Sequence, residues 1–206
     1  MAKRFAAVLI LMMLTASAGL FAQAGDDRIP YDDLPRLGSA DAPVKVVDFS
    51  DFKCPHCKSF AEGVLPLIRN EFISAGIVSF YYMHFPVVGQ DSVTAGAAAA
   101  AVHDLYGNDA FWSFEKALFE NQGAPREAWA TPEYLASLAA SVVEAADEEE
   151  LLAAIRSGDY VDVVRRDYEI GRELGVTGTP TLVIGDRVVK DAGNYRLVRE
   201  VIESMR

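Results

Sequence analysis

The chain has 206 residues, of which 51% are hydrophobic, so it is long enough to bury the core of a domain without disulfide crosslinks. It carries 30 acidic and 19 basic side chains, which give a net charge of −11. Because a surface of that sign repels phosphate backbones and anionic lipids, nucleic acid is not an expected partner.

The chain opens with the features of a secretory leader. A positive start and an apolar run over residues 5–21 are followed by Ala22-Gln23-Ala24, which has the small-x-small pattern of a cleavage site. We expect residues 1–24 to be a signal peptide, which places the mature protein in the periplasm or another extracytoplasmic compartment. The alternative is an uncleaved membrane anchor, because the run is close to the minimum length that spans a bilayer.

After the leader, a polar segment precedes a strand–helix–strand pattern. Residues 25–39 are rich in charge and proline and are expected to be extended. Within residues 40–91, apolar β-rich runs at 44–52 and 76–86 are typical of buried strands. The segment between them has helical periodicity over 58–72, which Pro66 is expected to kink. This order predicts a parallel βαβ unit.

Helical patterns then fill residues 92–175. The first is rich in alanine, and Thr131-Pro132 and the pair Asp147 and Glu150 have the spacing of helix starts. We predict helix boundaries of this insertion at Ser92, Thr131, Asp147, Gly158 and Gly175.

Strand character returns over residues 176–206. The runs "TLVI" and "RVVK" flank Gly185-Asp186, which is typical of a two-residue hairpin turn. An amphipathic helix pattern closes the chain. The whole sequence therefore predicts an α/β fold that is interrupted by an all-helical insertion.

The only two cysteines, Cys54 and Cys57, stand in the motif CPHC directly after the first predicted strand. Pro55 fits the first turn of a helix, where its missing N–H has no cost. Cys54 is then expected at the helix N-terminus, where free N–H groups and the helix dipole stabilise a thiolate. His56 can add a hydrogen bond or a positive charge.

The two thiols are expected to differ in role. Cys54, at the tip, is predicted to be the more exposed sulfur that reacts with substrate, whereas Cys57, one turn later, is predicted to be the buried resolving thiol. A stabilised thiolate favours the reduced pair, so the disulfide would be a strong oxidant. Lys53 and Lys58 are expected to add only solvated charge.

Asp48 precedes Cys54 by six residues on the predicted strand and is expected to lie beneath the active-site turn. A half-buried carboxylate there would have a raised pKa and could exchange protons with Cys57. The alternative is a solvated or capping aspartate. Asp51 is closer to Cys54 and would oppose a thiolate.

Structural roles for the cysteine pair compete with redox chemistry. A zinc site needs four ligands, and the chain adds only His56, His84 and His103, without zinc-binding spacing, so no metal is expected. A permanent crosslink over so short a loop would constrain the unfolded chain very little. His84 is predicted to be a packing or surface residue, and His103 a structural one. The core of the insertion is predicted to contain Phe111, Trp112, Phe114 and Phe119, with a substrate-facing surface as the alternative for this cluster.

These features occur in an order that resembles the thioredoxin superfamily, and within it the DsbA-like thiol-disulfide oxidoreductases. The strand "VVDFSDF" leads into CPHC, and "YYMHFP", "AAAAAVHDLYGNDAFWSFEKALF" and "LGVTGTPTLVIGDRVV" follow. The likeness covers residues 40–206. It implies a thioredoxin fold, with a central mixed sheet and flanking helices, that is interrupted by an inserted all-helical domain.

The resemblance also implies site residues and an activity. Thr179-Pro180 would be a cis peptide that faces the sulfurs and binds extended substrate. Asp48 matches the acidic residue beneath the site. The implied enzyme donates its disulfide to reduced or unfolded secreted proteins, is reoxidised by a membrane partner or a small molecule, and needs no bound cofactor. Because Thr179 also resembles disulfide isomerases, a reductase or isomerase remains an alternative, as does a non-catalytic peptide-binding chaperone.

Overall fold

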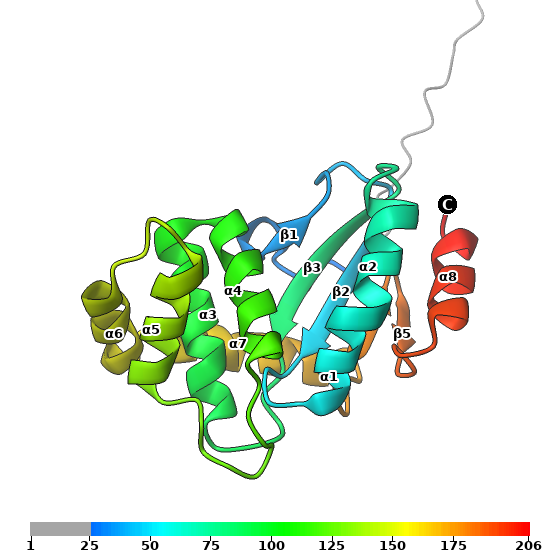
Figure 1. Cartoon of the computed structure of the whole chain (residues 1–206). Helices are drawn as coiled ribbons and strands as arrows, with labels where there is room; N and C mark the ends of the chain where they lie inside the picture. The colour runs from blue at the N-terminus through cyan, green and yellow to red at the C-terminus, as the bar shows by residue number, and fades with distance from the viewer. Residues whose placement is uncertain (1–25) are drawn as a thin grey trace, which may run out of the picture.

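The computed structural model describes residues 26–206, and the expected signal peptide lies outside them. Within these residues, no helix has the length and apolar character needed to cross a membrane. The described chain forms a five-stranded sheet with the order β1-β3-β2-β4-β5, and helices pack around it (Figure 1). This mixed sheet with flanking helices confirms the predicted fold class.

The centre of the sheet is the predicted βαβ unit. Strands β2 (Val44–Ser50) and β3 (Val78–His84) pair in parallel and are buried along almost their whole length. The hairpin of β4 (Thr181–Ile184) and β5 (Arg187–Val189) adds to β2 in the antiparallel sense, with its turn at Gly185-Asp186 as predicted.

The sequence did not predict the fifth strand. In the segment expected to be only extended, β1 (Arg36–Leu37) pairs antiparallel with β3, after a 3₁₀ turn at Tyr31–Asp33. A strand of two residues has too few positions for the alternation of polar and apolar side chains to be visible.

The helix after the cysteine motif begins at Pro55, as predicted, and is irregular. It comprises α1 (Pro55–Ser59), α2 (Leu65–Ile68) and two π-helical stretches, Phe60–Val64 and Arg69–Ile73. The irregularity expected at Pro66 is the first π-helical stretch, which directly precedes α2. A proline lacks the N–H for the regular ladder, and its ring needs the space that a wider turn provides.

The remaining helices are α3 (Ser92–Tyr106), α4 (Asn108–Glu120), α5 (Pro132–Val142), α6 (Glu148–Ser157), α7 (Val161–Glu173) and α8 (Tyr195–Ser204). Thr131 and Asp147 cap α5 and α6, as predicted, by accepting N–H groups of Tyr134 and Glu150. The predicted cap at Ser92 is wrong. Asp91 occupies the capping position, while the Ser92 hydroxyl accepts the N–H of Gly89 and closes the turn before the helix.

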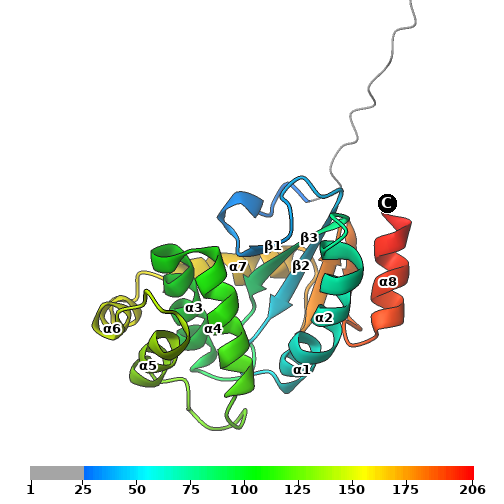
Figure 2. The ribbon, with the colours of Figure 1, turned by 45° about the horizontal axis from the view of Figure 1, so that its top comes forward.

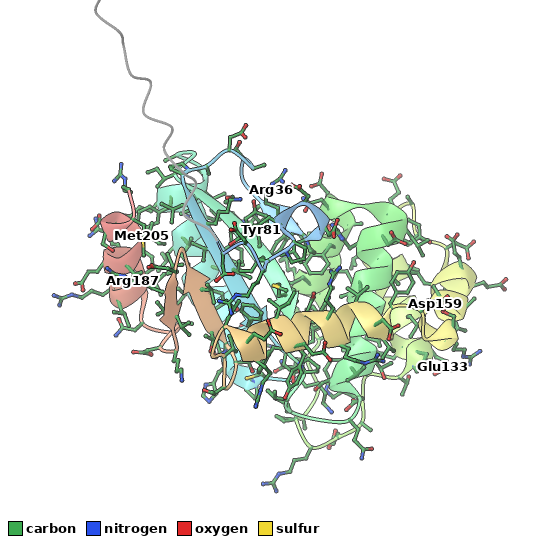
Figure 3. All side chains as sticks on the ribbon, turned by 180° about the vertical axis from the view of Figure 1, so that it is seen from behind. Arg36, Tyr81, Glu133, Asp159, Arg187 and Met205 are labelled. Atoms are coloured by element: carbon green, nitrogen blue, oxygen red, sulfur yellow. The ribbon has the colours of Figure 1, made fainter. Side chains whose placement is uncertain are left out.

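Two apolar layers cover the sheet. Helices α3–α6 are grouped at one side of the sheet, with α8 beside the opposite edge (Figures 1 and 2). One layer contains side chains of α1, α2, α4 and α8 against Val46 and Tyr82. The second lies between the sheet and α7, which crosses the other face (Figure 3). A Cβ at Gly171 of α7 would lie 2.8 Å from Phe85, so only glycine allows this close approach.

Candidate active site

The cysteine motif lies where β2 ends and α1 begins. Cys54 occupies the capping position of α1 with an extended backbone, and Pro55 is the first helical residue, as the sequence predicts. Both cysteines are free thiols in this structure. Cys57 has no exposed surface and Cys54 is only 5% exposed, so Cys54 is more buried than its expected position at an exposed tip implies.

The loop around Pro180 covers Cys54. The Thr179–Pro180 peptide bond is cis, as the resemblance implies. The Cys54 sulfur lies 3.5 Å from the carbonyl oxygen of Thr179, to which it donates a hydrogen bond when it is protonated. This contact places the backbone of the cis-proline loop directly against the first sulfur of the motif.

The two thiols have opposite electrostatic environments. A hydrogen bond from the Cys57 thiol lowers the pKa of Cys54 to about 5, and the Thr179 side chain and the N–H groups of Cys57 and His56 act in the same direction, against the effect of burial. Burial raises the pKa of Cys57 well above its usual range, and the hydrogen bond to Cys54 and the charge of Asp48 raise it further. At neutral pH, Cys54 is therefore a thiolate and Cys57 a thiol.

A groove adjoins this pair on the side of the cis-proline loop. Its volume is about 380 Å³, and Phe60 and Val64 from the helix after the motif face Thr179 and Pro180 across it. His56 also lines the groove, with an exposed side chain, so the N–H of His56 acts on Cys54 from the backbone while its imidazole faces solvent.

Asp48 lies on β2, on the sheet face that packs against α1. It is only 4% exposed, whereas the sequence predicts a half-buried residue. The Ser50 hydroxyl donates a 2.7 Å hydrogen bond to Oδ2, but Oδ1 is buried without a partner in the described chain. Burial raises the pKa of Asp48 to about 7, against the hydrogen bond from Ser50, and the charge of Cys54 adds to the increase. The structure therefore brings Asp48 close to both sulfurs.

Sequence reasoning missed a second buried carboxyl, Glu115 of α4. It is 7% exposed, and burial raises its pKa to about 8, with a further contribution from the charge of Asp48 and an opposing one from Arg69. A signal was present in the sequence. Glu115 stands four residues after Phe111 and four before Phe119, on the stripe of α4 that the aromatic residues mark as buried.

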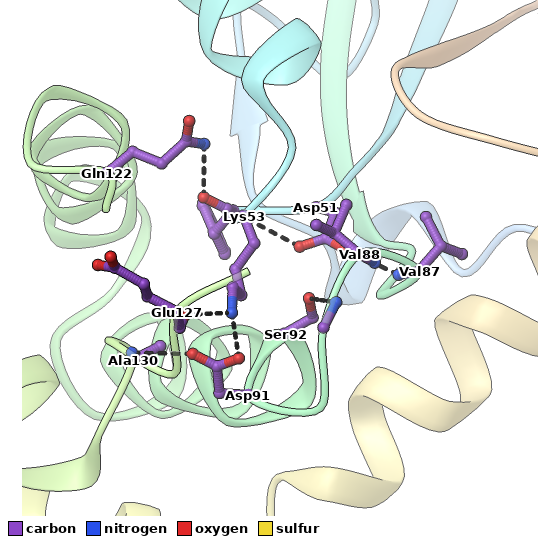
Figure 4. A network of polar contacts seen from close by, with 11 residues as sticks. Asp51, Lys53, Val87, Val88, Asp91, Ser92, Gln122, Glu127 and Ala130 are labelled. Carbon is purple, nitrogen blue, oxygen red and sulfur yellow. Dashed lines mark hydrogen bonds and ion pairs between the residues drawn. The ribbon is translucent and has the colours of Figure 1, made fainter. Parts of the chain in front are cut away.

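The prediction that Lys53 is solvated is wrong. Lys53 is 1% exposed, and its ammonium group forms an ion pair with Asp91 and donates a 2.8 Å hydrogen bond to the carbonyl oxygen of Glu127 (Figure 4). Gly89 leaves room for it, because a Cβ there would lie 2.8 Å from the Lys53 nitrogen. A lysine beside a reactive cysteine gives no local indication of burial, since its partners are distant in the chain.

Asp51 belongs to the same polar network. Its carboxylate accepts the N–H groups of Val87 and Val88 at 2.8 Å and that of Lys53 at 2.9 Å (Figure 4). These bonds tie the loop after β3 to the turn before the cysteine motif. The carboxylate that was expected to oppose a thiolate is thus occupied by backbone donors.

Gln122, two residues after the end of α4, contacts the cysteine motif directly. Its side-chain nitrogen donates to the carbonyl oxygens of Phe52 and Cys54 at 2.7 and 3.1 Å. The helical insertion thereby holds the backbone on both sides of Lys53.

The other two histidines lie away from the sulfurs. His84 is buried among the rings of Phe52, Tyr82 and Phe111, and burial lowers its pKa to about 3. His103 is half-buried beside Phe111. Of the two roles expected for His84, the structure shows packing, and the aromatic residues predicted as core are buried. Over residues 26–206, no group of three or more histidine, cysteine or acidic side chains is placed to hold a metal ion.

Comparison with known proteins gives consistent results. A family model described as thioredoxin matches residues 32–204. Disulfide bond formation protein D of Bacillus subtilis is 34% identical over 82% of this chain and 75% of its own length. The probable disulfide bond formation protein D of Bacillus cereus is also 34% identical, over 78% of this chain and 74% of its own length. The crystal structure of oxidised BdbD from Bacillus subtilis superposes with a TM-score of 0.79 and 33% identity, and covers 84% of this chain and 93% of that one.

Proposed function

The chain belongs to the thioredoxin family, and from this premise we propose that it is an extracytoplasmic disulfide oxidase that donates the Cys54–Cys57 disulfide to folding proteins. Its class is that of the thiol-disulfide oxidoreductases. The main support for disulfide donation, rather than reduction, is the lowered pKa of Cys54, about 5, together with the raised pKa of Cys57. A stabilised thiolate favours the reduced pair, and therefore makes its disulfide oxidising.

The reaction proceeds through two exchanges. A substrate thiolate attacks Cys54, the bond between Cys54 and Cys57 breaks, and Cys57 leaves with the electron pair and takes a proton. A second substrate thiolate then attacks the substrate sulfur of the mixed disulfide, which forms the substrate disulfide and releases Cys54 as a thiolate. Two substrate thiols are oxidised, the enzyme pair is reduced, and one proton is released to solvent.

Each site residue has a place in this scheme. Cys54 is the sulfur that is attacked, because Cys57 has no exposed surface. The low pKa of Cys54 then makes it a good leaving group in the second exchange. Pro55 and His56 belong to the helix start that stabilises its thiolate. Asp48 is the proton donor to Cys57, since its raised pKa of about 7 allows it to hold a proton at neutral pH.

The groove beside the cis-proline loop is the proposed substrate site. Extended peptide can add to the free backbone of Thr179 and Pro180 as a strand adds to a sheet edge. Phe60 and Val64 provide an apolar wall for a side chain of the substrate. Unfolded proteins that expose thiols and apolar residues fit such a site, and a membrane partner or a small-molecule oxidant would restore the disulfide.

The reduction potential decides the direction of exchange. At equilibrium with glutathione, we expect a potential near that of the strongly oxidising DsbA, about −120 mV, and far from the −270 mV or so of thioredoxin. A value at or below that of thioredoxin would overturn the oxidase in favour of a reductase.

A trapping experiment tests the order of attack. Cys57→Ser is expected to accumulate a mixed disulfide between Cys54 and a thiol peptide, whereas Cys54→Ser is expected to form none. Full activity of Cys54→Ser would favour the non-catalytic chaperone instead.

A further inference from the structure

A second groove lies on the other side of the active-site helix. It has a volume of about 540 Å³ and runs between α2 and α4, with Pro66 and Arg69 on one wall and Trp112 and Phe119 on the other. Glu115 lines it, although the residue is only 7% exposed. Glu115 therefore lies between the buried layer beneath α4 and a groove that is open to solvent.

The aromatic neighbours of Glu115 show which way its helix face points. Phe111, one turn before Glu115, lies with its ring centre 5.2 Å from that of Tyr82. Phe119, one turn after it, lies 5.3 Å from Phe52, which itself stacks on Tyr82 at 5.2 Å. Because residues four apart share a helix face, Glu115 lies over the stacked pair Phe52 and Tyr82.

Tyr82 connects this face to the active site. It is the register partner of Asp48 in the parallel pair of β2 and β3, so both side chains leave the sheet on the same face. The Tyr82 hydroxyl and Oδ1 of Asp48 are both buried without a hydrogen-bond partner in the described chain. Unpartnered buried groups in one layer indicate a water site or a proton-handling role.

We propose that Glu115 is a relay residue that carries protons between the groove and Asp48, through the polar layer that contains the Tyr82 hydroxyl. This inference rests on the proposed function, because Asp48 exchanges protons with Cys57 only during thiol-disulfide exchange. Glu115 acts through Asp48 and touches neither substrate nor sulfur in this scheme.

The relay supplies the one proton that Cys57 takes up. In the first exchange, the attacking thiolate forms a bond to Cys54 as the bond between Cys54 and Cys57 breaks, Cys57 leaves with the electron pair, and Asp48 gives its proton to that sulfur. Glu115 then gives its proton to Asp48, directly or through water beside Tyr82, and takes a proton from solvent in the groove. Electrons move only between sulfurs, and the carboxyls end as they began.

The charges around Glu115 support this role. Its raised pKa of about 8 and that of Asp48, about 7, mean that both carboxyls can hold a proton at neutral pH. Arg69 faces Glu115 across the groove and opposes the increase, so it limits how far the pKa rises. The other titratable groups around the groove and the layer beneath it are Glu62, Lys116, Glu120, Tyr82, Asp51 and Cys57.

The test is the rate at which dithiothreitol reduces the oxidised protein, normalised to the dithiothreitol thiolate, as a function of pH. The native rate is expected to fall as pH rises through about 8, where Glu115 loses its proton. In Glu115→Gln, the fall is expected near pH 7, where Asp48 alone titrates. Between these values, the variant should be slower by about two- to fivefold.

Matched variants separate a relay from a structural effect. Glu120→Gln removes an exposed carboxyl from the same groove and should leave the profile unchanged. Glu115→Asp keeps a carboxyl, so its reduction rate should again fall near pH 8. This variant also tests the relay if Glu115→Gln folds poorly. In an Asp48→Asn background, Glu115→Gln should have less than about a twofold effect, since its route to Cys57 is already broken.

Two outcomes would overturn the relay: a native-like profile in Glu115→Gln, or an equal loss of rate with and without Asp48. Failure of the proposed function looks different. In that case the native protein itself would resist dithiothreitol or have a reducing potential. A native protein that is rapidly reduced and oxidising, but indifferent to Glu115→Gln, rejects the relay alone.

Discussion

Two buried polar clusters lie near the cysteine motif, and they differ in how well their charges are paired. In the ion-paired cluster, which consists of Asp51, Lys53 and Asp91, the charged groups meet backbone donors or acceptors or one another. In the carboxyl cluster, which consists of Asp48, Tyr82 and Glu115, two buried oxygens lack a partner within residues 26–206.

The comparison shows how partners decide what a buried charge does. Burial favours the neutral form of an acid, while hydrogen bonds and opposite charges favour the ionised form. The Lys53 ion pair and the N–H of Ala130 help hold the pKa of Asp91 below its usual value, against burial. Asp48 and Glu115 have little such compensation, and their pKa values are raised. The first cluster therefore fixes structure, and the second can bind and release protons.

The largest expected effect comes from breaking the ion-paired cluster. Lys53→Met keeps an unbranched side chain but leaves Asp91 without its cation, and we expect it to lower the free energy of unfolding by about 3–5 kcal/mol. Urea denaturation measures this loss. Lys58→Met is the control, because Lys58 forms only an exposed pair with Glu62 at 3.7 Å and should cost less than about 1 kcal/mol. Equal losses in the two variants would contradict the distinction.

Asp48→Asn should have the opposite effect on stability, and only at high pH. The pKa of Asp48 is raised from 3.8 to about 7, so its favourable contribution is complete below pH 3.8 and is lost as pH rises through 7. Asparagine does not titrate. We therefore expect the oxidised variant to match the native protein at pH 4 and to be more stable by about 2–4 kcal/mol at pH 8. A gain that does not change with pH would show that Asp48 does not titrate in this range.

A smaller effect is expected where the helical insertion holds the motif. Gln122→Ala leaves the carbonyl oxygens of Phe52 and Cys54 without their side-chain donor, and should lower the free energy of unfolding by about 1–2 kcal/mol. Gln90→Ala is the matched control, because Gln90 is exposed and should change stability by less than about 0.5 kcal/mol. Both can be measured from urea midpoints. If Gln122→Ala behaved like Gln90→Ala, the insertion would not stabilise the motif.

Local patterns predicted the elements that local chemistry determines. The strand before Cys54, the helix start at Pro55 and the caps at Thr131 and Asp147 depend on residues within a few positions of one another. The cis bond before Pro180 was expected only from the resemblance, since composition favours trans.

Contacts between distant parts of the chain could not be predicted in this way. Lys53 is buried because Asp91 and Glu127, 38 and 74 residues later, surround it. The aromatic stripe of α4 indicates that Glu115 is buried, but only the fold shows that it lies over Tyr82 of a distant strand. Charge and periodicity indicate that a residue is polar, but burial depends on which elements meet.

The central claim is that Cys54 is a thiolate at neutral pH while Cys57 keeps its proton, and a titration of the reduced protein tests it most directly. Thiolate absorbance followed against pH, with alkylation to identify the reacting sulfur, should show Cys54 ionising at about 5 and no second thiolate before Cys57 titrates above 9. A first ionisation near 9, or one that alkylation assigns to Cys57, would contradict it.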